Sequence, residues 1–199
     1  MQFLRQVMRP WQAVAALAVL CLLVLQGLEQ SGWIAWRFVR AADGSYAAWQ
    51  LIASQFVHLS WAHALGNAAA AALLAWIAKH MAPALVSFVA LLAAMFAVAA
   101  VLAWDAQCLY YAGISGALHG WLAGLLLWCI GVGNQRGVAV TALVVLCLKL
   151  LWQAQWLLGL PALSSVVPIY TPAHVAGVSG GLTAMVLMLA GRRFMVASA

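Results

Sequence analysis

Three short clusters of polar residues interrupt the apolar stretches of this sequence, and their residue types suit nucleophilic catalysis. The first contains His63 and Asn67, which are four positions apart and therefore project from one face of a helix. The second contains Ser115 and the third contains His174. A serine hydroxyl becomes a nucleophile when a histidine accepts its proton. The chemistry that these residues predict is attack of Ser115 on a carbonyl, with His174 as the base.

The other polar groups and glycines of the clusters support the same prediction. A tetrahedral intermediate needs N–H donors for its oxyanion, and His63, Asn67 and the backbone of Ser115 could supply them. Glycines at spacings of three and four residues predict two small-residue ridges, which would let the helices of Ser115 and His174 approach closely. The glycines of the ridges are Gly116, Gly120 and Gly124 in one segment and Gly177 and Gly181 in the other. The residues predicted to support the site are His58, His119, Gly113, Gly116 and Gly177.

The sequence excludes several other catalytic sites. Its three acids are Glu29, Asp43 and Asp105, and all lie outside the apolar segments. A membrane-embedded pair of aspartates is therefore unavailable, and no carboxylate can complete a triad. No HExxH motif is present, and the four cysteines have no metal-ligand spacing. We therefore expect a serine–histidine dyad that uses no metal and no cofactor.

The composition predicts a polytopic membrane protein. The 199 residues are 68% hydrophobic and 6% charged, with a mean hydropathy of +1.05. Soluble domains are about 45–50% apolar and about 25% charged. The net charge of +6 includes no basic run, so it does not indicate a nucleic-acid partner.

Six stretches are long and apolar enough to span a bilayer as helices, and we expect one membrane domain over residues 1–199. We interpret the first stretch as a retained helix, because its length and its poor cleavage site do not fit a signal peptide. Most lysines and arginines fall on one side of a six-span arrangement, which predicts that both termini are cytoplasmic. Lys149 is the one cation inside a span; we expect it to snorkel or to face a wet interior, with no chemical role. The predicted spans are 11–28, 56–78, 83–104, 113–132, 138–158 and 172–191.

This topology predicts that the three polar clusters meet at one depth. The second, fourth and sixth spans run in the same direction, and each cluster lies near the N-terminal end of its span. Nine residues of helix cover about 14 Å, so all three clusters belong to the outer leaflet. Polar residues within a membrane are costly, which makes such a gathering a functional site by default.

The ordered motifs of this chain resemble those of the rhomboid family. The match rests on HxxxxHxxxN from His58 to Asn67, on GxSG around Ser115, and on AHxxG around His174. The resemblance implies a six-helix bundle and an intramembrane serine protease. It implies that Ser115 is the nucleophile, His174 the base, and His63 and Asn67 the oxyanion-hole side chains. It also implies that His58 orders the first outer loop.

Two departures from the family pattern are informative. The first-loop Trp-Arg pair of many rhomboids is represented by Trp49-Gln50, which puts the usual anchoring of that loop in doubt.

His119 stands where many rhomboids carry an aromatic that stacks on the catalytic histidine. The resulting GxSGxxHG form resembles the rhombosortase subgroup. That resemblance implies a bacterial inner-membrane enzyme, with its site facing the periplasm. Its implied partner is a transmembrane protein substrate with a C-terminal Gly-Gly motif, an apolar helix and a basic tail.

Two readings from other classes of protein stay open. A catalytically silent rhomboid relative could act as a membrane binding module, although such relatives typically lose the serine or the histidine. A membrane protein that binds haem or a metal through its histidines would leave Ser115 and Asn67 unexplained. A small transporter is less consistent with the sequence, which has no internal repeat and no buried carboxylate.

Overall fold

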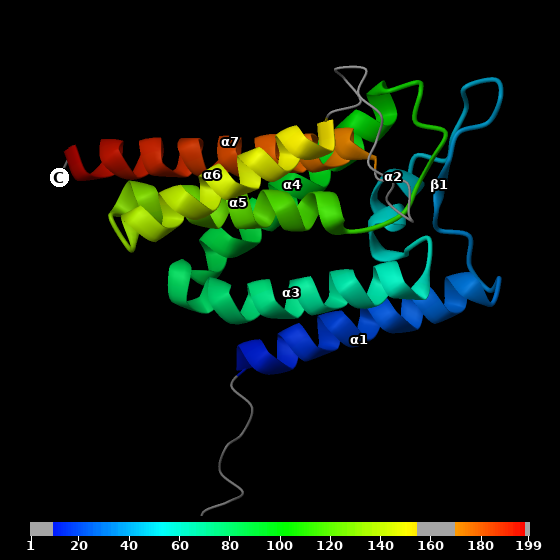
Figure 1. The fold of residues 1–199 in the computed structure, drawn as a ribbon, viewed down its shortest axis with the longest axis horizontal. Coiled ribbons are helices and arrows are strands. Elements are labelled where there is room, and N and C mark those ends of the chain that lie inside the picture. Colours follow the sequence, from blue (N-terminus) through cyan, green and yellow to red (C-terminus); the bar gives the residue numbers. More distant parts are fainter. Residues whose placement is uncertain (1–9, 155–169, 198–199) are drawn as a thin grey trace, which may run out of the picture.

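The computed structural model describes residues 10–154 and 170–197, which form a bundle of long helices (Figure 1). Two very short strands and a few short helical turns lie at one end of this bundle. In chain order the elements are α1 (Pro10–Gln30), β1 (Phe38–Val39), α2 (Gln50–Ala53), the 3-10 turn η1 (Ser54–Phe56), α3 (Trp61–Met81), α4 (Ala84–Trp104), β2 (Tyr110–Tyr111), α5 (Ser115–Val132), α6 (Arg136–Gln153) and α7 (Thr171–Ala197).

Five of the described helices are long and apolar enough to cross a membrane, namely α3, α4, α5, α6 and α7 as far as Arg192. The chain is therefore an integral membrane protein of the all-helical class. The described apolar part of α1, Ala15–Gln30, is shorter than these. The prediction of six spans is thus met for five helices, and the sixth crossing and the cytoplasmic termini stay predictions.

Three helix boundaries differ from the predicted spans by at least five residues; one is the end of α7, which reaches Ala197 where residue 191 was expected. The second span was expected from residue 56, but α3 begins at Trp61, because residues 54–56 form the turn η1 and Ser60 caps the helix. The Ser60 Oγ accepts a hydrogen bond from the His63 backbone N–H at 3.2 Å. The fifth span was expected to reach residue 158, but α6 ends at Gln153. The connection between the predicted spans 138–158 and 172–191 lies outside the described residues as far as residue 169.

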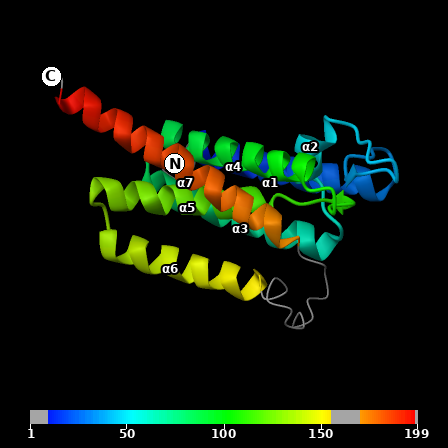
Figure 2. The ribbon, with the colours of Figure 1, turned by 90° about the horizontal axis from the view of Figure 1, so that it is seen from above.

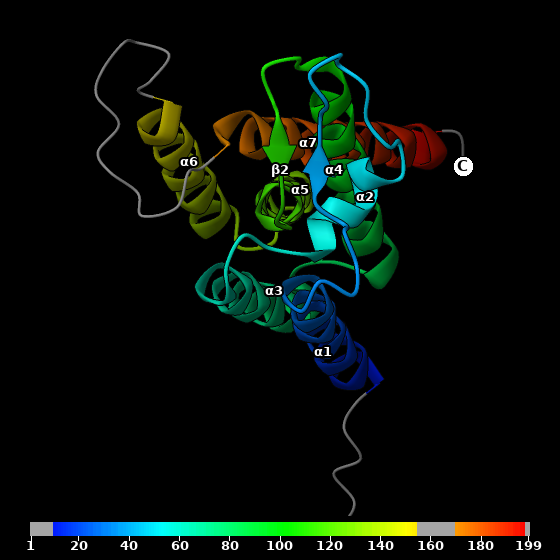
Figure 3. The same ribbon diagram turned by 90° about the vertical axis from the view of Figure 1, so that its right-hand side faces the viewer.

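The core of the bundle is built around α5. Seen along the bundle in Figure 3, α5 lies in the middle, with α3, α4, α6 and α7 around it. Its buried residues Ala117, Leu118 and Leu125 pack in one cluster with Ala90 and Met95 of α4. Most side chains of α6 are exposed, and Figure 2 shows this helix at one side of the bundle. Most of these exposed side chains are apolar, as expected for a surface that faces lipid.

The N-terminal ends of α3, α5 and α7 lie at the same end of the bundle, next to β1 and β2 (Figure 1). The two strands pair antiparallel, with Phe38 opposite Tyr111 and Val39 opposite Tyr110. The first connection, residues 31–49, is thereby tied to the segment that leads into α5. This arrangement agrees with the prediction that the three polar clusters share one depth.

Arg40 ties the same connection to the end of α4. Its guanidinium donates to the carbonyl of Leu102 at 2.6 Å and to that of Cys108 at 3.3 Å. It also lies over the ring of Tyr46, with its Cζ 4.7 Å from the ring centroid. The last carbonyls of a helix have no partner within the helix, so a cation there both satisfies and stabilises them.

Glycines bring α5 and α7 into direct backbone contact. A Cβ added at Gly120 would overlap the carbonyl oxygen of Gly177, and one added at Gly181 would overlap the carbonyl oxygen of Gly120. No residue other than glycine fits at these positions without moving a helix. The predicted small-residue ridges are therefore confirmed as the contact between these two helices.

Gly181→Ala tests this contact. We expect the substitution to destabilise the protein by about 1–3 kcal/mol, because the new methyl group forces α7 away from α5. The measurement is unfolding of the purified protein in mixed detergent micelles. Gly191→Ala is the matched control on the same helix, since an added Cβ there meets nothing within 4 Å. Equal stability of the two variants would contradict the packing described.

Candidate active site

Ser115 and His174 form a hydrogen bond at the start of their helices. Ser115 is the first residue of α5, and His174 lies in the first turn of α7. The Ser115 Oγ is 2.9 Å from the His174 Nε2. The His174 side chain is buried, with 6% of its surface exposed. The structure therefore brings together the two residues that the sequence predicts as nucleophile and base.

Gly116 sets the distance between these two residues. A Cβ added at this glycine would lie 2.7 Å from the carbonyl oxygen of Ala173, the residue before His174. Gly177 faces the same place from α7, since a Cβ there would overlap the carbonyl oxygen of Gly116. The two glycines predicted to support the site thus allow the approach that the hydrogen bond requires.

His119 lies one helical turn after Ser115 and stacks on the histidine of the pair. The rings of His119 and His174 are 4.2 Å apart between centroids and inclined by 14°. The His119 Nδ1 is 2.6 Å from the Ser115 carbonyl oxygen. A carbonyl oxygen only accepts, so Nδ1 carries the proton of this ring and Nε2 holds the lone pair.

Lys149 of α6 hydrogen bonds to the Nε2 of His119. An ammonium group within a membrane span requires an acceptor, and the free lone pair of His119 provides one. The expectation that Lys149 snorkels or faces a wet interior, with no chemical role, did not include this contact. The residue as a whole is exposed, but its ammonium group is bound to His119 next to the serine–histidine pair.

Gln153 is a site residue that the sequence reasoning missed. Its Oε1 is 3.0 Å from the Nδ1 of His174, on the opposite side of the ring from Ser115. The signal was present as a polar residue four positions after Lys149, within the predicted span 138–158. Its side chain lies at the place where a carboxylate completes a serine–histidine–aspartate triad.

His63 and Asn67 lie beside the segment that leads into Ser115. A Cβ added at Gly113 would be 2.8 Å from the Cε1 of His63 and 3.6 Å from the Nδ2 of Asn67. Gly113 has a φ of 134°, a conformation that only glycine adopts readily. Both requirements explain why a glycine stands two residues before the serine.

The amide of Asn67 keeps a free donor next to the site. Its Nδ2 is buried and has no hydrogen-bond partner within the described part of the chain. A buried donor without a partner is costly, which is consistent with a group reserved for a ligand or an intermediate. The role of His63 and Asn67 as oxyanion donors stays a prediction.

His58 lies behind this part of the site. Its side chain is completely buried, and its ring meets that of His63 edge-on, with centroids 5.0 Å apart. Its backbone N–H donates to the Oε1 of Gln26 at 2.7 Å, which joins α1 to the start of α3. Its carbonyl accepts from Arg37 at 3.4 Å.

Other contacts hold the first outer connection in place of the family's Trp-Arg pair. The Gln50 side chain donates to the carbonyl of Ala35 at 3.2 Å. Arg37 forms an ion pair with Glu29, with 3.1 Å between the Nε and Oε1 atoms. Together with Arg40, these side chains anchor the connection that the sequence departure had put in doubt.

Tyr170 and Cys108, which lie outside the spans, do not compete with Ser115 as nucleophile. Asp105 accepts a hydrogen bond from the Tyr170 hydroxyl at 2.5 Å. The pKa of Tyr170 is raised, mainly by burial and secondly by this hydrogen bond. Burial, with a further contribution from Asp105, raises the pKa of Cys108 to about 11. The Cys108 thiol is therefore protonated at neutral pH and is a poor nucleophile.

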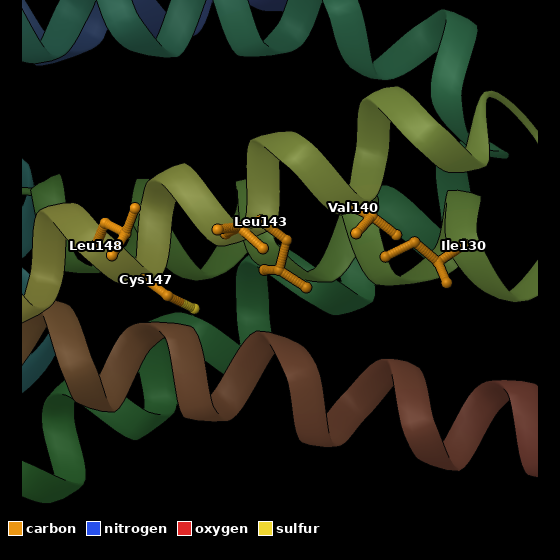
Figure 4. A pocket seen from close by; sticks show the side chains of 6 residues that line it. Ile130, Val140, Leu143, Cys147 and Leu148 are labelled. Carbon is orange, nitrogen blue, oxygen red and sulfur yellow. The ribbon is translucent and has the colours of Figure 1, made fainter.

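Two further features lie apart from the serine–histidine pair. An apolar groove runs between α5 and α6 and contains none of the predicted site residues (Figure 4). It is lined by Ile130, Val140, Leu143, Val144, Cys147 and Leu148. Within residues 10–154 and 170–197, no three His, Cys, Asp or Glu side chains are placed to hold a metal ion.

The arrangement defines a helical membrane protein with a hydroxyl–imidazole pair of the kind that serine hydrolases use. The family model for the rhomboid domain matches residues 46–191, which is most of the chain and includes every predicted site residue. The chain therefore belongs to the rhomboid family, whose members are generally intramembrane serine proteases. A search of curated proteins finds no match to the sequence.

Asn67→Ala tests the free donor beside the site. If this amide stabilises a developing oxyanion, its removal lowers kcat by about 10²–10³-fold with little change in KM. The measurement is turnover of a fluorogenic transmembrane peptide by the purified protein. Asn134→Ala, in the exposed turn between α5 and α6, is the matched control and is expected to retain full activity. A kcat equal to that of the control would remove Asn67 from the site.

Proposed function

We propose that this protein is an intramembrane serine endopeptidase that cleaves membrane-anchored proteins near the outer face of the bilayer. The observation that carries the proposal is the 2.9 Å hydrogen bond between Ser115 and His174, in a chain of the rhomboid family. The placement of this pair at the start of two spanning helices supports a site within reach of water. It is also consistent with a substrate helix that is cut near its upper end.

The proposed reaction proceeds through an acyl-enzyme. The Ser115 oxygen attacks the substrate carbonyl carbon as its proton passes to the Nε2 of His174. His63, Asn67 and the Ser115 N–H stabilise the oxyanion of the tetrahedral intermediate. The C–N bond then breaks, and His174 transfers the proton to the leaving amine. In the second half, His174 takes a proton from a water molecule that attacks the ester carbon. The bond between this carbon and the Ser115 oxygen then breaks, and His174 returns the proton to Ser115 as the new carboxyl end of the product leaves.

We further propose that the enzyme is a rhombosortase of the bacterial inner membrane, with its site facing the periplasm. The support is the GxSGxxHG sequence, together with the stacking of His119 on His174 at 4.2 Å. The substrate would carry a C-terminal Gly-Gly motif, an apolar helix and a basic tail. A peptide bond within a helix is shielded from attack, so the substrate helix must unwind at the cleavage site. Glycines destabilise a helix and therefore make this unwinding easier.

Co-expression with a reporter of this design tests both the serine protease activity and the rhombosortase specificity. The reporter is a secreted domain followed by Gly-Gly, an apolar helix and a basic tail, and the product mass identifies the cleaved bond. We expect cleavage by the wild type and none by Ser115→Ala or His174→Ala, because each variant removes one partner of the pair. A second reporter with Leu-Leu in place of Gly-Gly should be cut at least tenfold more slowly.

The outcomes separate the family-level activity from the subgroup. Cleavage that persists in Ser115→Ala would contradict the serine mechanism. Equal cleavage of the two reporters would contradict the rhombosortase specificity and leave the protease activity in place. A wild type that cuts neither reporter and does not react with a fluorophosphonate would favour a catalytically silent binding module.

A further inference from the structure

Helix α6 presents two polar side chains to the site, and both reach the histidines of the other helices. Lys149 and Gln153 are four residues apart and therefore lie on one face of α6. Lys149 binds His119 of α5, and Gln153 binds His174 of α7. We propose that Gln153 is a positioning residue that completes the serine–histidine pair as a triad, and that Lys149 holds the stacked ring of His119 in place. This inference rests on the proposed protease function.

The contact of Gln153 fixes which nitrogen of His174 carries the proton. An amide oxygen only accepts, so the Nδ1 of His174 donates to the Gln153 Oε1 across 3.0 Å. The Nε2 of the neutral ring then holds its lone pair toward the Ser115 hydroxyl, 2.9 Å away. This is the tautomer that a general base requires. Without a partner at Nδ1, the ring could rotate or adopt the other tautomer.

The backbone of Gln153 is held by the same helix that carries the histidine. The Thr171 Oγ1 donates to the Gln153 carbonyl oxygen at 3.2 Å. Thr171 precedes His174 by three residues, so the two side chains lie on one face of α7. The end of α6 is thus attached to the first turn of α7 by one backbone contact and one side-chain contact.

No acid of the chain is placed to act instead of this amide. Glu29 pairs with Arg37, Asp43 accepts from the Ser45 side chain at 2.7 Å, and Asp105 accepts from Tyr170. A neutral amide orients the imidazole without adding a negative charge. It therefore stabilises the imidazolium of the transition state less than a carboxylate does.

Lys149 acts on His174 through the ring of His119. Its ammonium donates to the Nε2 of His119, whose Nδ1 is held by the Ser115 carbonyl at 2.6 Å. Both nitrogens of His119 are occupied, so this ring cannot turn away from the His174 ring on which it stacks. The groups that face His174 are then Ser115 and His119 from α5, Lys149 and Gln153 from α6, and His63 from α3.

Substitutions at Gln153 separate positioning from packing. Gln153→Leu keeps a similar size but removes the acceptor, whereas Gln153→Glu keeps an acceptor oxygen at the same reach. For Gln153→Leu we expect kcat to fall about 10–100-fold with KM within twofold, as for other residues that orient a histidine ring. Gln107→Leu makes the same chemical change at an exposed outer position and should leave kcat unchanged.

The Gln153→Glu variant changes the pH dependence of kcat, which a purely structural role of Gln153 would leave unchanged. We expect Gln153→Glu to recover most of the kcat lost in Gln153→Leu. It should also move the acidic limb of the pH–kcat profile to higher pH, because a carboxylate at Nδ1 favours the protonated ring. Lys149→Met should lower kcat severalfold, whereas Lys149→Arg, which keeps a donor, should retain more of it.

The results distinguish failure of this inference from failure of the proposed function. If the wild type cleaves the transmembrane peptide and Ser115→Ala does not, the protease function stands. Gln153→Leu with the wild-type kcat and pH profile would then overturn the positioning role alone. Gln153→Glu as inactive as Gln153→Leu, with unfolding temperatures equal to that of the wild type, would also overturn it. A wild type without activity would remove both proposals.

Discussion

The direct packing of α5 on α7 is the contact on which the rest of the site depends. Ser115 and His174 belong to different helices, and a hydrogen bond of 2.9 Å between two short side chains requires backbones that nearly touch. Gly116 and Gly177 permit this, because any side chain there would overlap the facing carbonyl group. In lipid, apolar burial provides little drive for two helices to associate, so close van der Waals packing of small residues has to supply it. The geometry of the pair and the stability of the bundle therefore have a common origin.

The second constraint is the cost of polar groups inside a membrane. The site meets it in part by connecting the polar side chains around Ser115 to one another. Lys149 binds His119, His119 binds the Ser115 carbonyl and stacks on His174, and His174 lies between Ser115 and Gln153. His58, His63 and Asn67 are exceptions, since both ring nitrogens of His58, the Nδ1 of His63 and the Nδ2 of Asn67 are buried without a partner within the described residues. Free polar groups on His63 and Asn67, beside the serine, are consistent with a site prepared for an anionic intermediate.

Much of this arrangement could be predicted from the sequence, for reasons specific to membranes. Spanning helices have nearly fixed lengths, so apolar runs locate α4, α5 and α7 within a few residues, and alternating direction places Ser115, His174 and Asn67 at one end of the bundle. The rotation of a helix about its axis is harder to predict when most of its surface is apolar. For this reason Gln153 was missed, and Lys149 was not recognised as a partner of His119. The anchoring by Arg40 was also not predicted, because it depends on where the strands β1 and β2 bring a loop residue against the end of α4.

The central claim is that His174 activates Ser115 as a nucleophile, and the rate of covalent modification tests it without knowledge of the natural substrate. The purified protein is treated with a fluorophosphonate, and peptide mass spectrometry locates the adduct and follows its formation. We predict that the adduct forms on Ser115 alone and that His174→Ala lowers its rate by at least about 10²-fold, the lower end of what a general base contributes. Modification of Ser115 at equal rates in the wild type and His174→Ala, or an adduct on a different residue, would contradict the account.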